Sequence, residues 1–127
     1  MNKEIINTQQ APAPIGPYNQ AVKSNGMLYI SGQIALVPGT DELLTHDLVE
    51  ETKQVMQNLK AILHAAQIDF SHAVKTSIFL SDMKHFATVN EVYASYFQDH
   101  YPARETVHVS GLPKGVNVEI SMIATLQ

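Results

Sequence analysis

The ten residues Asn25-Gly26-Met27-Leu28-Tyr29-Ile30-Ser31-Gly32-Gln33-Ile34 decide how the first half of the chain folds. An Asn-Gly pair between β-prone runs is a strong hairpin signal, because both residues tolerate the left-handed backbone that the turn requires. After this pair, Leu28, Ile30, Gly32 and Ile34 alternate with the other side chains, which is the period of a half-buried strand. The stretch therefore predicts a hairpin between residues 18–23 and 27–34.

The period of the apolar residues changes to that of a helix over Asp47–Ala66. Asp47, followed three residues later by Glu50, can form a capping box at the start of this helix. The apolar stripe consists of Leu48, Val55, Met56, Leu59, Ile62, Leu63 and Ala66. We therefore expect an amphipathic helix that packs one side on the strands.

Three more strands and a second helix are predicted toward the C-terminus. A short extra strand is predicted near Ile5, at the other end of the sequence. The helix is capped by Ser81 or Asp82 and runs to about Asp99. The strands cover Val74–Leu80, Arg104–Ser110 and Asn117–Thr125, the last two joined by a turn at Leu112-Pro113-Lys114-Gly115. This order predicts an α+β fold in which two helices cover one face of a mixed sheet, so that the other face needs solvent or a partner.

Composition limits the possible classes of protein. The 127 residues have the usual length of one domain, and no linker or repeat divides residues 1–127. The 16% of charged residues is low for a solitary monomer and favours an oligomer. A net charge of −4, with Lys and Arg scattered singly, disfavours nucleic-acid binding. Because cysteine, a signal peptide and a membrane-length apolar run are all lacking, we expect a cytoplasmic protein without disulfides.

Arg104 is the main candidate for holding a small ligand by its carboxylate. If the last two strands form a hairpin with their apolar residues toward the helices, Arg104, Thr106 and Glu119 project together from the opposite face. One interpretation is an ordinary surface salt bridge between Arg104 and Glu119. The other is that Arg104 grips a carboxylate through two parallel N–H bonds, while Glu119 accepts a proton from water. The residues alone leave both interpretations open.

Three further features, Tyr18, the Ser31-Gly32 pair and Asn90, each have a structural and a functional interpretation. Tyr18 follows a rigid proline-rich loop and could either pack or donate its hydroxyl to a ligand. Gly32, after Ser31 within a strand, indicates either a β-bulge or the close approach of a ligand to the backbone. Asn90 could hold a loop or line a pocket. The six histidines lack zinc-site spacing, and no phosphate loop or dinucleotide fingerprint occurs, so we expect neither a metal nor a cofactor.

Eight short segments, in this order, resemble the RidA (reactive intermediate deaminase A, YjgF-like) family. They are Ala13–Tyr18, Ile30–Ile34, Val55–Leu63, Val74–Thr76, Phe86–Tyr93, Tyr101–Arg104, Leu112–Lys114 and Val118–Ile120. The resemblance covers nearly the whole chain. It implies a chorismate-mutase-like α+β fold and a homotrimer in which the sheets pack inward and the ligand clefts lie between subunits.

The same resemblance implies an activity and a set of site residues. The activity is the hydrolysis of 2-imino acids and their enamine tautomers, such as 2-iminobutanoate and 2-iminopropanoate, to 2-oxo acids and ammonia without a cofactor. Arg104 would bind the substrate carboxylate, and Glu119 would activate the attacking water. The other residues that the resemblance places at the substrate are Tyr18, Ser31, Gly32, Asn90 and Thr106.

The chain departs from the deaminating members of the family in two segments. Where they commonly read Pro-Ala-Arg-Ser-Cys, this chain has Glu105 and Thr106 after Arg104, so a threonine takes the place of the cysteine. Where they read Ala-Arg-Leu-Pro-Lys, it has Ser110 and Gly111, which removes an arginine. The alternative function is a regulatory module that binds small carboxylates without efficient turnover. A ribonuclease activity, attributed to some relatives, is disfavoured by the acidic balance.

Overall fold

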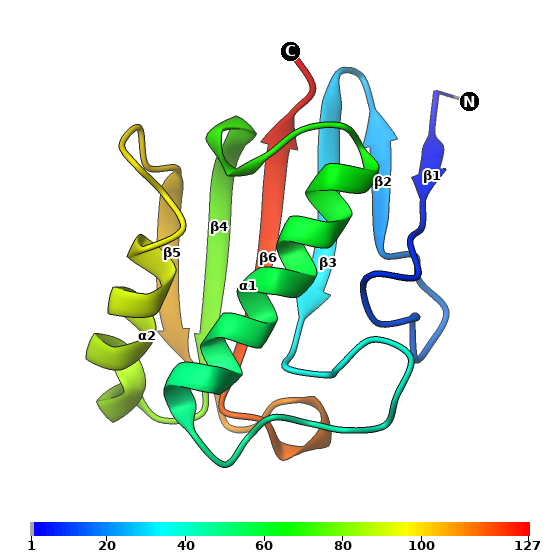
Figure 1. The fold of residues 1–127 in the computed structure, drawn as a ribbon. Coiled ribbons are helices and arrows are strands. Elements are labelled where there is room, and N and C mark those ends of the chain that lie inside the picture. Colours follow the sequence, from blue (N-terminus) through cyan, green and yellow to red (C-terminus); the bar gives the residue numbers. More distant parts are fainter. Residues whose placement is uncertain (1) are drawn as a thin grey trace.

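The computed structural model describes residues 2–127, which form a six-stranded sheet with helices on one side (Figure 1). The strand order is β1-β2-β3-β6-β4-β5. β4 and β5 run parallel, and the other neighbouring strands are antiparallel. The strands are β1 (Glu4–Ile6), β2 (Ala21–Ser24), β3 (Met27–Gln33), β4 (Ala73–Leu80), β5 (Ala103–His108) and β6 (Val118–Thr125). The short strand predicted near Ile5 is confirmed as β1.

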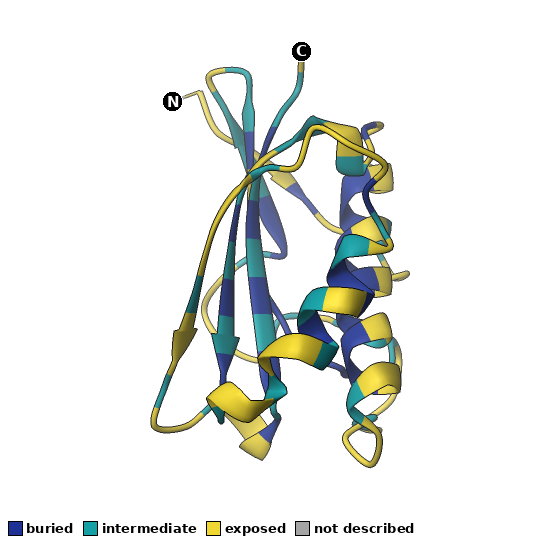
Figure 2. Cartoon of the chain, turned by 90° about the vertical axis from the view of Figure 1, so that its left-hand side faces the viewer, coloured by how far each residue is buried: buried dark blue, intermediate teal, exposed yellow. Residues whose placement is uncertain are grey.

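Two α-helices, α1 (Leu48–Ala65) and α2 (Phe86–Ala94), cover the same face of the sheet, as predicted (Figure 2). Asp47 caps α1, because its carboxylate accepts hydrogen bonds from the backbone N–H groups of Val49 and Glu50 at 2.9 and 3.2 Å. Short 3₁₀ turns occupy Phe70–His72, Met83–His85 and Pro113–Gly115. No helix within residues 2–127 is long and apolar enough to cross a membrane.

The core lies between the apolar stripe of α1 and alternate residues of the central strands. In β6, every second side chain is buried toward the helices: Val118, Ile120, Met122 and Ala124. The predicted stripe residues from Val55 to Leu63 are fully buried. The alternation also fixes the side of the sheet on which each polar residue of a strand lies, and this decides the geometry of the site.

The predicted hairpin between β2 and β3 is confirmed. Both turn residues have positive φ, 52° at Asn25 and 79° at Gly26, as a type I′ turn requires. The second helix ends at Ala94, well before the predicted Asp99. After it the chain turns so that Phe97 packs against Tyr93 and Phe70, with ring centroids 4.9 and 5.4 Å apart. The α-helical pairing is replaced there by bonds to the third residue back, from the N–H groups of Tyr96 and Phe97 to the carbonyls of Tyr93 and Ala94 at 3.1 Å each.

The predicted pairing of the last two strands is wrong. β5 pairs with β4 in parallel register, and β6 pairs with β4 from the other side, so β4 lies between β5 and β6. The connection β4-α2-β5 is a crossover unit, and a helix between two strands returns the second strand parallel to the first. The turn at Pro113–Gly115 therefore joins strands that are not neighbours.

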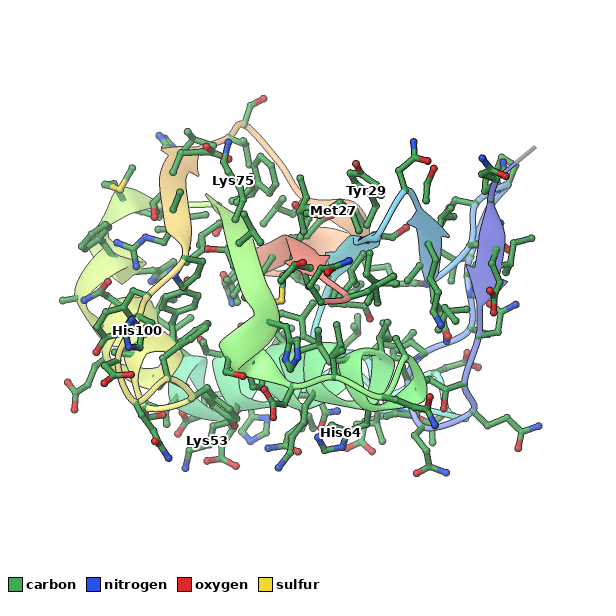
Figure 3. All side chains as sticks on the ribbon, turned by 90° about the horizontal axis from the view of Figure 1, so that it is seen from above. Met27, Tyr29, Lys53, His64, Lys75 and His100 are labelled. Carbon is green, nitrogen blue, oxygen red and sulfur yellow. The ribbon has the colours of Figure 1, made fainter. Side chains whose placement is uncertain are left out.

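The sheet face away from the helices carries a mixture of apolar and polar side chains. Ile5, Tyr29 and Val107 are 50%, 47% and 38% exposed, respectively. Figure 3 shows Tyr29 and Lys75 projecting from this face, whereas Lys53 and His64 lie on the outer side of α1. The Nζ of Lys75 lies 2.9 Å from a carboxylate oxygen of Glu105. In a single chain this partly apolar face is open.

Candidate functional site

Glu119 projects from β6 over the backbone of Gly32 in β3. The register between these strands shifts between Ile30 and Gln33, so the β-bulge that was one interpretation of Gly32 is present. A Cβ atom on Gly32 would overlap the Glu119 carboxylate and approach its Cγ to 3.1 Å. A bulge and a close approach are therefore both present at Gly32, and within the chain the approaching group is the Glu119 side chain.

The Glu119 carboxyl group opens into a cavity of about 360 Å³. Its walls are largely apolar and come from the proline-rich loop, the end of β3 and the turn before β6. They include Pro12, Ala13, Ile15, Ile34, Leu36 and Pro113, together with the polar Tyr18, Gln20, Ser31 and Gln33. Glu119 is half-buried, and this burial raises the pKa of its carboxyl group above the ordinary value for glutamate. A carboxylate of raised pKa beside an apolar cavity can act as a general base.

Tyr18 and Ser31 both stabilise the loop that forms one wall of this cavity. The Tyr18 hydroxyl accepts a hydrogen bond from the backbone N–H of Ile15 at 3.3 Å. The Ser31 hydroxyl donates to the carbonyl of Asn19 at 2.6 Å. Both side chains therefore have the structural role that packing predicts, and both also line the cavity at Glu119.

Arg104, the only arginine of the chain, lies at a second cavity of about 320 Å³. Its guanidinium lies over two aromatic rings, with Cζ 5.7 Å from the ring centroid of Phe86 and 5.3 Å from that of Tyr93. Its Nη1 donates a hydrogen bond to the Oδ1 of Asn90 at 2.7 Å. Asn90 therefore holds the Arg104 side chain as well as lining the cavity. A guanidinium has five N–H donors, and this bond uses one of them.

The Tyr93 side chain, which contacts Arg104, is itself held by a residue of β4. Its hydroxyl shares a 2.8 Å hydrogen bond with the hydroxyl of Thr76, a fully buried residue of β4. Burial raises the pKa of Tyr93, so the phenol is neutral and its ring presents an ordinary π-face to Arg104. The contacts from Thr76 to Tyr93 and from Tyr93 to Arg104 thus orient the Arg104 guanidinium within the chain.

Thr106 lies on the same side of β5 as Arg104, in register with the buried Ile78 of β4. Its Oγ1 atom is buried and finds no hydrogen-bond partner among residues 2–127. Glu105 points to the other face, where its carboxylate pairs with Lys75 and Ser77. The glutamate that follows Arg104 therefore does not enter the Arg104 cavity, whereas Thr106 carries an unsatisfied hydroxyl on that side.

The prediction that Arg104, Thr106 and Glu119 share the open face is wrong. Arg104 contacts α2 on the helix-covered face, whereas Glu119 alternates with the buried residues of β6 and so points to the other face. Glu119 is aligned through Phe79 with Val107, so its Cα is roughly 14 Å from that of Arg104 by standard strand spacings. No Arg104–Glu119 salt bridge forms within residues 2–127. Arg104 and Glu119 of one chain therefore lie at two separate cavities on opposite faces of the sheet.

Two residues that shape the Glu119 cavity escaped the sequence analysis. The Gln20 side chain is 3% exposed and donates to the carbonyls of Thr8, Ala11 and Pro12. The Asn58 amide, buried within α1, donates to the carbonyls of Ile34 and Leu36 at 3.0 Å each. Asn58 occupies a gap in the apolar stripe of α1, and a polar residue in such a gap is the signal that could have revealed it.

Chain comparisons place this arrangement among known proteins. A family model described as Endoribonuclease L-PSP matches residues 8–126. The 2-iminobutanoate/2-iminopropanoate deaminase of Mus musculus is 49% identical over 122 residues, covering 96% of this chain and 90% of that protein. The crystal structure of YyfA from Yersinia pestis, a Rid-family protein of unknown function, matches with a TM-score of 0.94 at 46% identity, covering 97% of this chain and 98% of that one.

A further solved structure is that of Escherichia coli TdcF with bound serine. It matches with a TM-score of 0.91 at 42% identity, covering 96% of this chain and 98% of that one. These relatives share the α+β sheet that carries Glu119 and Arg104 in this chain. The chain belongs to the RidA (YjgF-like) family, as the order of its sequence motifs indicated. Its fold is the α+β fold that this membership predicts.

Replacing Gly32 with Ala should push the Glu119 carboxylate off the β3 backbone, because the added methyl occupies its position. We expect the pKa of Glu119, followed by NMR of its side-chain carboxyl carbon, to fall toward the ordinary glutamate value as the group moves into solvent. Gly111→Ala is the matched control, since nothing lies within 4 Å of a Cβ there. An unchanged Glu119 titration in Gly32→Ala would contradict the close approach.

Compared with the wild type, Glu119→Gln should stabilise the folded protein more at neutral pH than at acid pH. Because burial raises the pKa of Glu119 in the folded chain, the folded state keeps this proton to higher pH than the unfolded state. The favourable contribution of protonated Glu119 is complete below its unfolded pKa and is lost as pH rises through the folded pKa. In urea unfolding at fixed protein concentration, the free energy of unfolding of Glu119→Gln should therefore exceed that of the wild type by more at pH 7 than at pH 3. The opposite trend would mean that a nearby cation outweighs burial.

Proposed function

We propose that this protein is a 2-imino acid deaminase that hydrolyses 2-iminobutanoate, 2-iminopropanoate and their enamine tautomers, including 2-aminoacrylate, to 2-oxo acids and ammonia. The observation that carries the proposal is Glu119, a half-buried carboxylate held over Gly32 at the edge of an apolar cavity. The name of the Mus musculus relative supports the choice of substrate. The serine bound in the Escherichia coli relative supports a ligand of amino-acid size.

The reaction consumes one water and leaves the enzyme unchanged. Glu119 takes a proton from water as the water oxygen bonds to C2 of the imine, which is already electrophilic. Glu119 returns this proton to the imine nitrogen, which gives a neutral carbinolamine. The hydroxyl proton of the carbinolamine then passes through Glu119 to the same nitrogen, the C2–N bond breaks to release ammonia, and the C2–O bond becomes the carbonyl of the 2-oxo acid. The balance needs only the substrate and water, so we expect no cofactor.

Arg104 holds the substrate carboxylate through the N–H groups that Asn90 does not occupy. In a 2-imino acid, the carboxylate carbon is bonded directly to the reacting C2. One molecule therefore cannot reach both Arg104 and Glu119 of the same chain, which lie on opposite faces of the sheet. We infer that Arg104 of one subunit meets Glu119 of another across a cleft.

A homotrimer with its sheets packed inward is the assembly that we propose for this cleft. The open sheet face carries the half-exposed Ile5, Tyr29 and Val107, which burial against a copy of the chain would remove from water. Closed rotational symmetry gives every cleft the same pair of half-sites. Thr106 lies two residues after Arg104 on the same side of β5, and its buried hydroxyl has no partner among residues 2–127. We also propose that the protein is cytoplasmic.

The protein should accelerate 2-oxo acid and ammonia release when a dehydratase generates the enamine in situ. Arg104→Lys should lose about 90% or more of this activity, because a point charge cannot reproduce the planar fork. Lys60→Arg on the exposed side of α1 serves as the control. Equal rates with and without protein would refute the deaminase, and saturable 2-oxo acid binding without turnover would favour the regulatory binding module instead.

Mixed oligomers should test whether the cleft is shared between subunits. Arg104→Ala and Glu119→Gln should each be inactive alone. After co-refolding in equal amounts, about a quarter of the clefts should combine an intact Arg104 with an intact Glu119, because each half is drawn independently. Recovery to about a quarter of wild-type activity is the expected result. A mixture that stays inactive while wild-type protein survives the same refolding would contradict the shared cleft.

A further inference from the structure

Glu51 is a fully buried carboxylate that the proposed reaction does not use. It lies in the first turns of α1, and its side chain has no exposed surface. One carboxylate oxygen accepts a hydrogen bond from the backbone N–H of Asn117, and the other accepts one from the Asn117 side-chain amide, each at 2.8 Å. A helix and the start of a distant strand are thus joined by a two-point contact.

Asn117 is held on its other side as well. Its carbonyl accepts a hydrogen bond from the backbone N–H of Ser81 at 3.1 Å, and its side-chain oxygen lies 3.4 Å from the Ser81 hydroxyl. Glu51 and Ser81 together therefore engage the backbone N–H, the carbonyl and both polar side-chain atoms of Asn117. This residue comes immediately before β6, so its position sets where β6 begins.

Burying a carboxylate is unfavourable unless its oxygens are well paired, and apolar residues of similar volume are often at least as stabilising. The position of Glu51 near the positive end of α1 offsets part of this penalty. A buried carboxylate at this point gives the chain a direction-specific contact that an apolar side chain could not provide. The Glu51 carboxylate accepts hydrogen bonds from two N–H groups of Asn117 and so defines both the position and the orientation of Asn117.

Asn117 connects this contact to the walls of the Glu119 cavity. Glu119 lies two residues further along β6, where its carboxylate rests over Gly32. On the other side of Asn117, Val116 is buried, and the Pro113–Gly115 turn supplies Pro113 to the cavity wall. A shift of Asn117 would therefore move both the carboxylate and one wall of the cavity.

We propose that Glu51 is a positioning residue that fixes the start of β6 and thereby holds Glu119 in its reactive place over Gly32. This inference rests on the proposed deaminase for its kinetic consequence, although its geometric consequence can be measured without turnover. Glu51 does not line the Glu119 cavity. Both hydrogen bonds of its carboxylate go to Asn117.

A reciprocal exchange of the two side chains tests this role. Asn117→Asp places one carboxylate against another and should lower kcat by about tenfold to a hundredfold, since small misplacements of reacting groups have effects of this size. KM should change little, because Arg104 is held by α2. In the double variant Glu51→Gln/Asn117→Asp, the Gln amide donates to the new carboxylate and its oxygen accepts the backbone N–H. This exchange should restore kcat to within about threefold of wild type.

Three further variants complete the design. Glu51→Gln alone should retain most activity, because the Asn117 amide can rotate by a half-turn and pair with the new amide. Glu50→Gln is the matched control at the exposed neighbouring position, where Glu50 pairs with Lys53 at 3.6 Å. Asn117→Ala should lower kcat several-fold, and it takes the place of Asn117→Asp if that variant does not fold.

The pKa of Glu119, measured by carboxyl NMR, is the second readout. It should move in Asn117→Asp and return in the double variant, which separates positioning from a loss of overall stability. If folded Asn117→Asp or Asn117→Ala keeps the wild-type kcat and Glu119 titration, the inference is overturned. A folded double variant without recovery would overturn it as well. If the wild type itself is inactive, the deaminase proposal fails, and the Glu119 titration alone decides the role of Glu51.

Discussion

The parallel pairing of β5 with β4 is the constraint that organises the rest of the molecule. It aligns Arg104 with Thr76, and since Thr76 is buried against α2, the Arg104 side chain must lie on the helix-covered face. The antiparallel pairing of β6 with β4 places Glu119 on the other face. Because side chains alternate strictly along a strand, no rotamer of either residue brings the two groups together through the sheet. A small ligand that needs both groups requires a second copy of the chain.

Most of the local structure could be read from the sequence. The Asn25-Gly26 turn, the stripe of α1, the capping role of Asp47 and the alternation in β6 all follow from interactions between residues close in the chain. The motifs singled out Arg104 and Glu119 for one pocket, whereas the two residues line separate cavities. The sequence could not show which strand lies beside β5, because strand order depends on contacts between distant residues. The Pro113–Gly115 turn resembles the turn of a hairpin locally, and nothing in its residues excludes that pairing.

The irregular segments around the Glu119 cavity depend on buried polar side chains of regular elements. Gln20 holds the proline-rich loop, and Asn58 of α1 holds the exit from β3 by two carbonyls. Each lost hydrogen bond of this kind leaves a buried group unsatisfied, at a cost of about 1–3 kcal/mol. The shape of the cavity therefore depends on Asn58, which lies outside its lining, and on Gln20, which lines it. Such residues are invisible to a search for reactive side chains.

The departure from the family motif at Thr106 places a buried hydroxyl where relatives commonly have a cysteine. A buried hydroxyl without a partner among residues 2–127 is unfavourable by about 1–3 kcal/mol in the isolated chain. A cysteine at this position would avoid that penalty, because a thiol is a weak donor and tolerates apolar surroundings. Threonine is therefore less favourable than cysteine at this position in the isolated chain. Because its Oγ1 atom is buried, the change from the family motif alters the packing of β5 near Arg104 and adds no exposed donor beside the guanidinium.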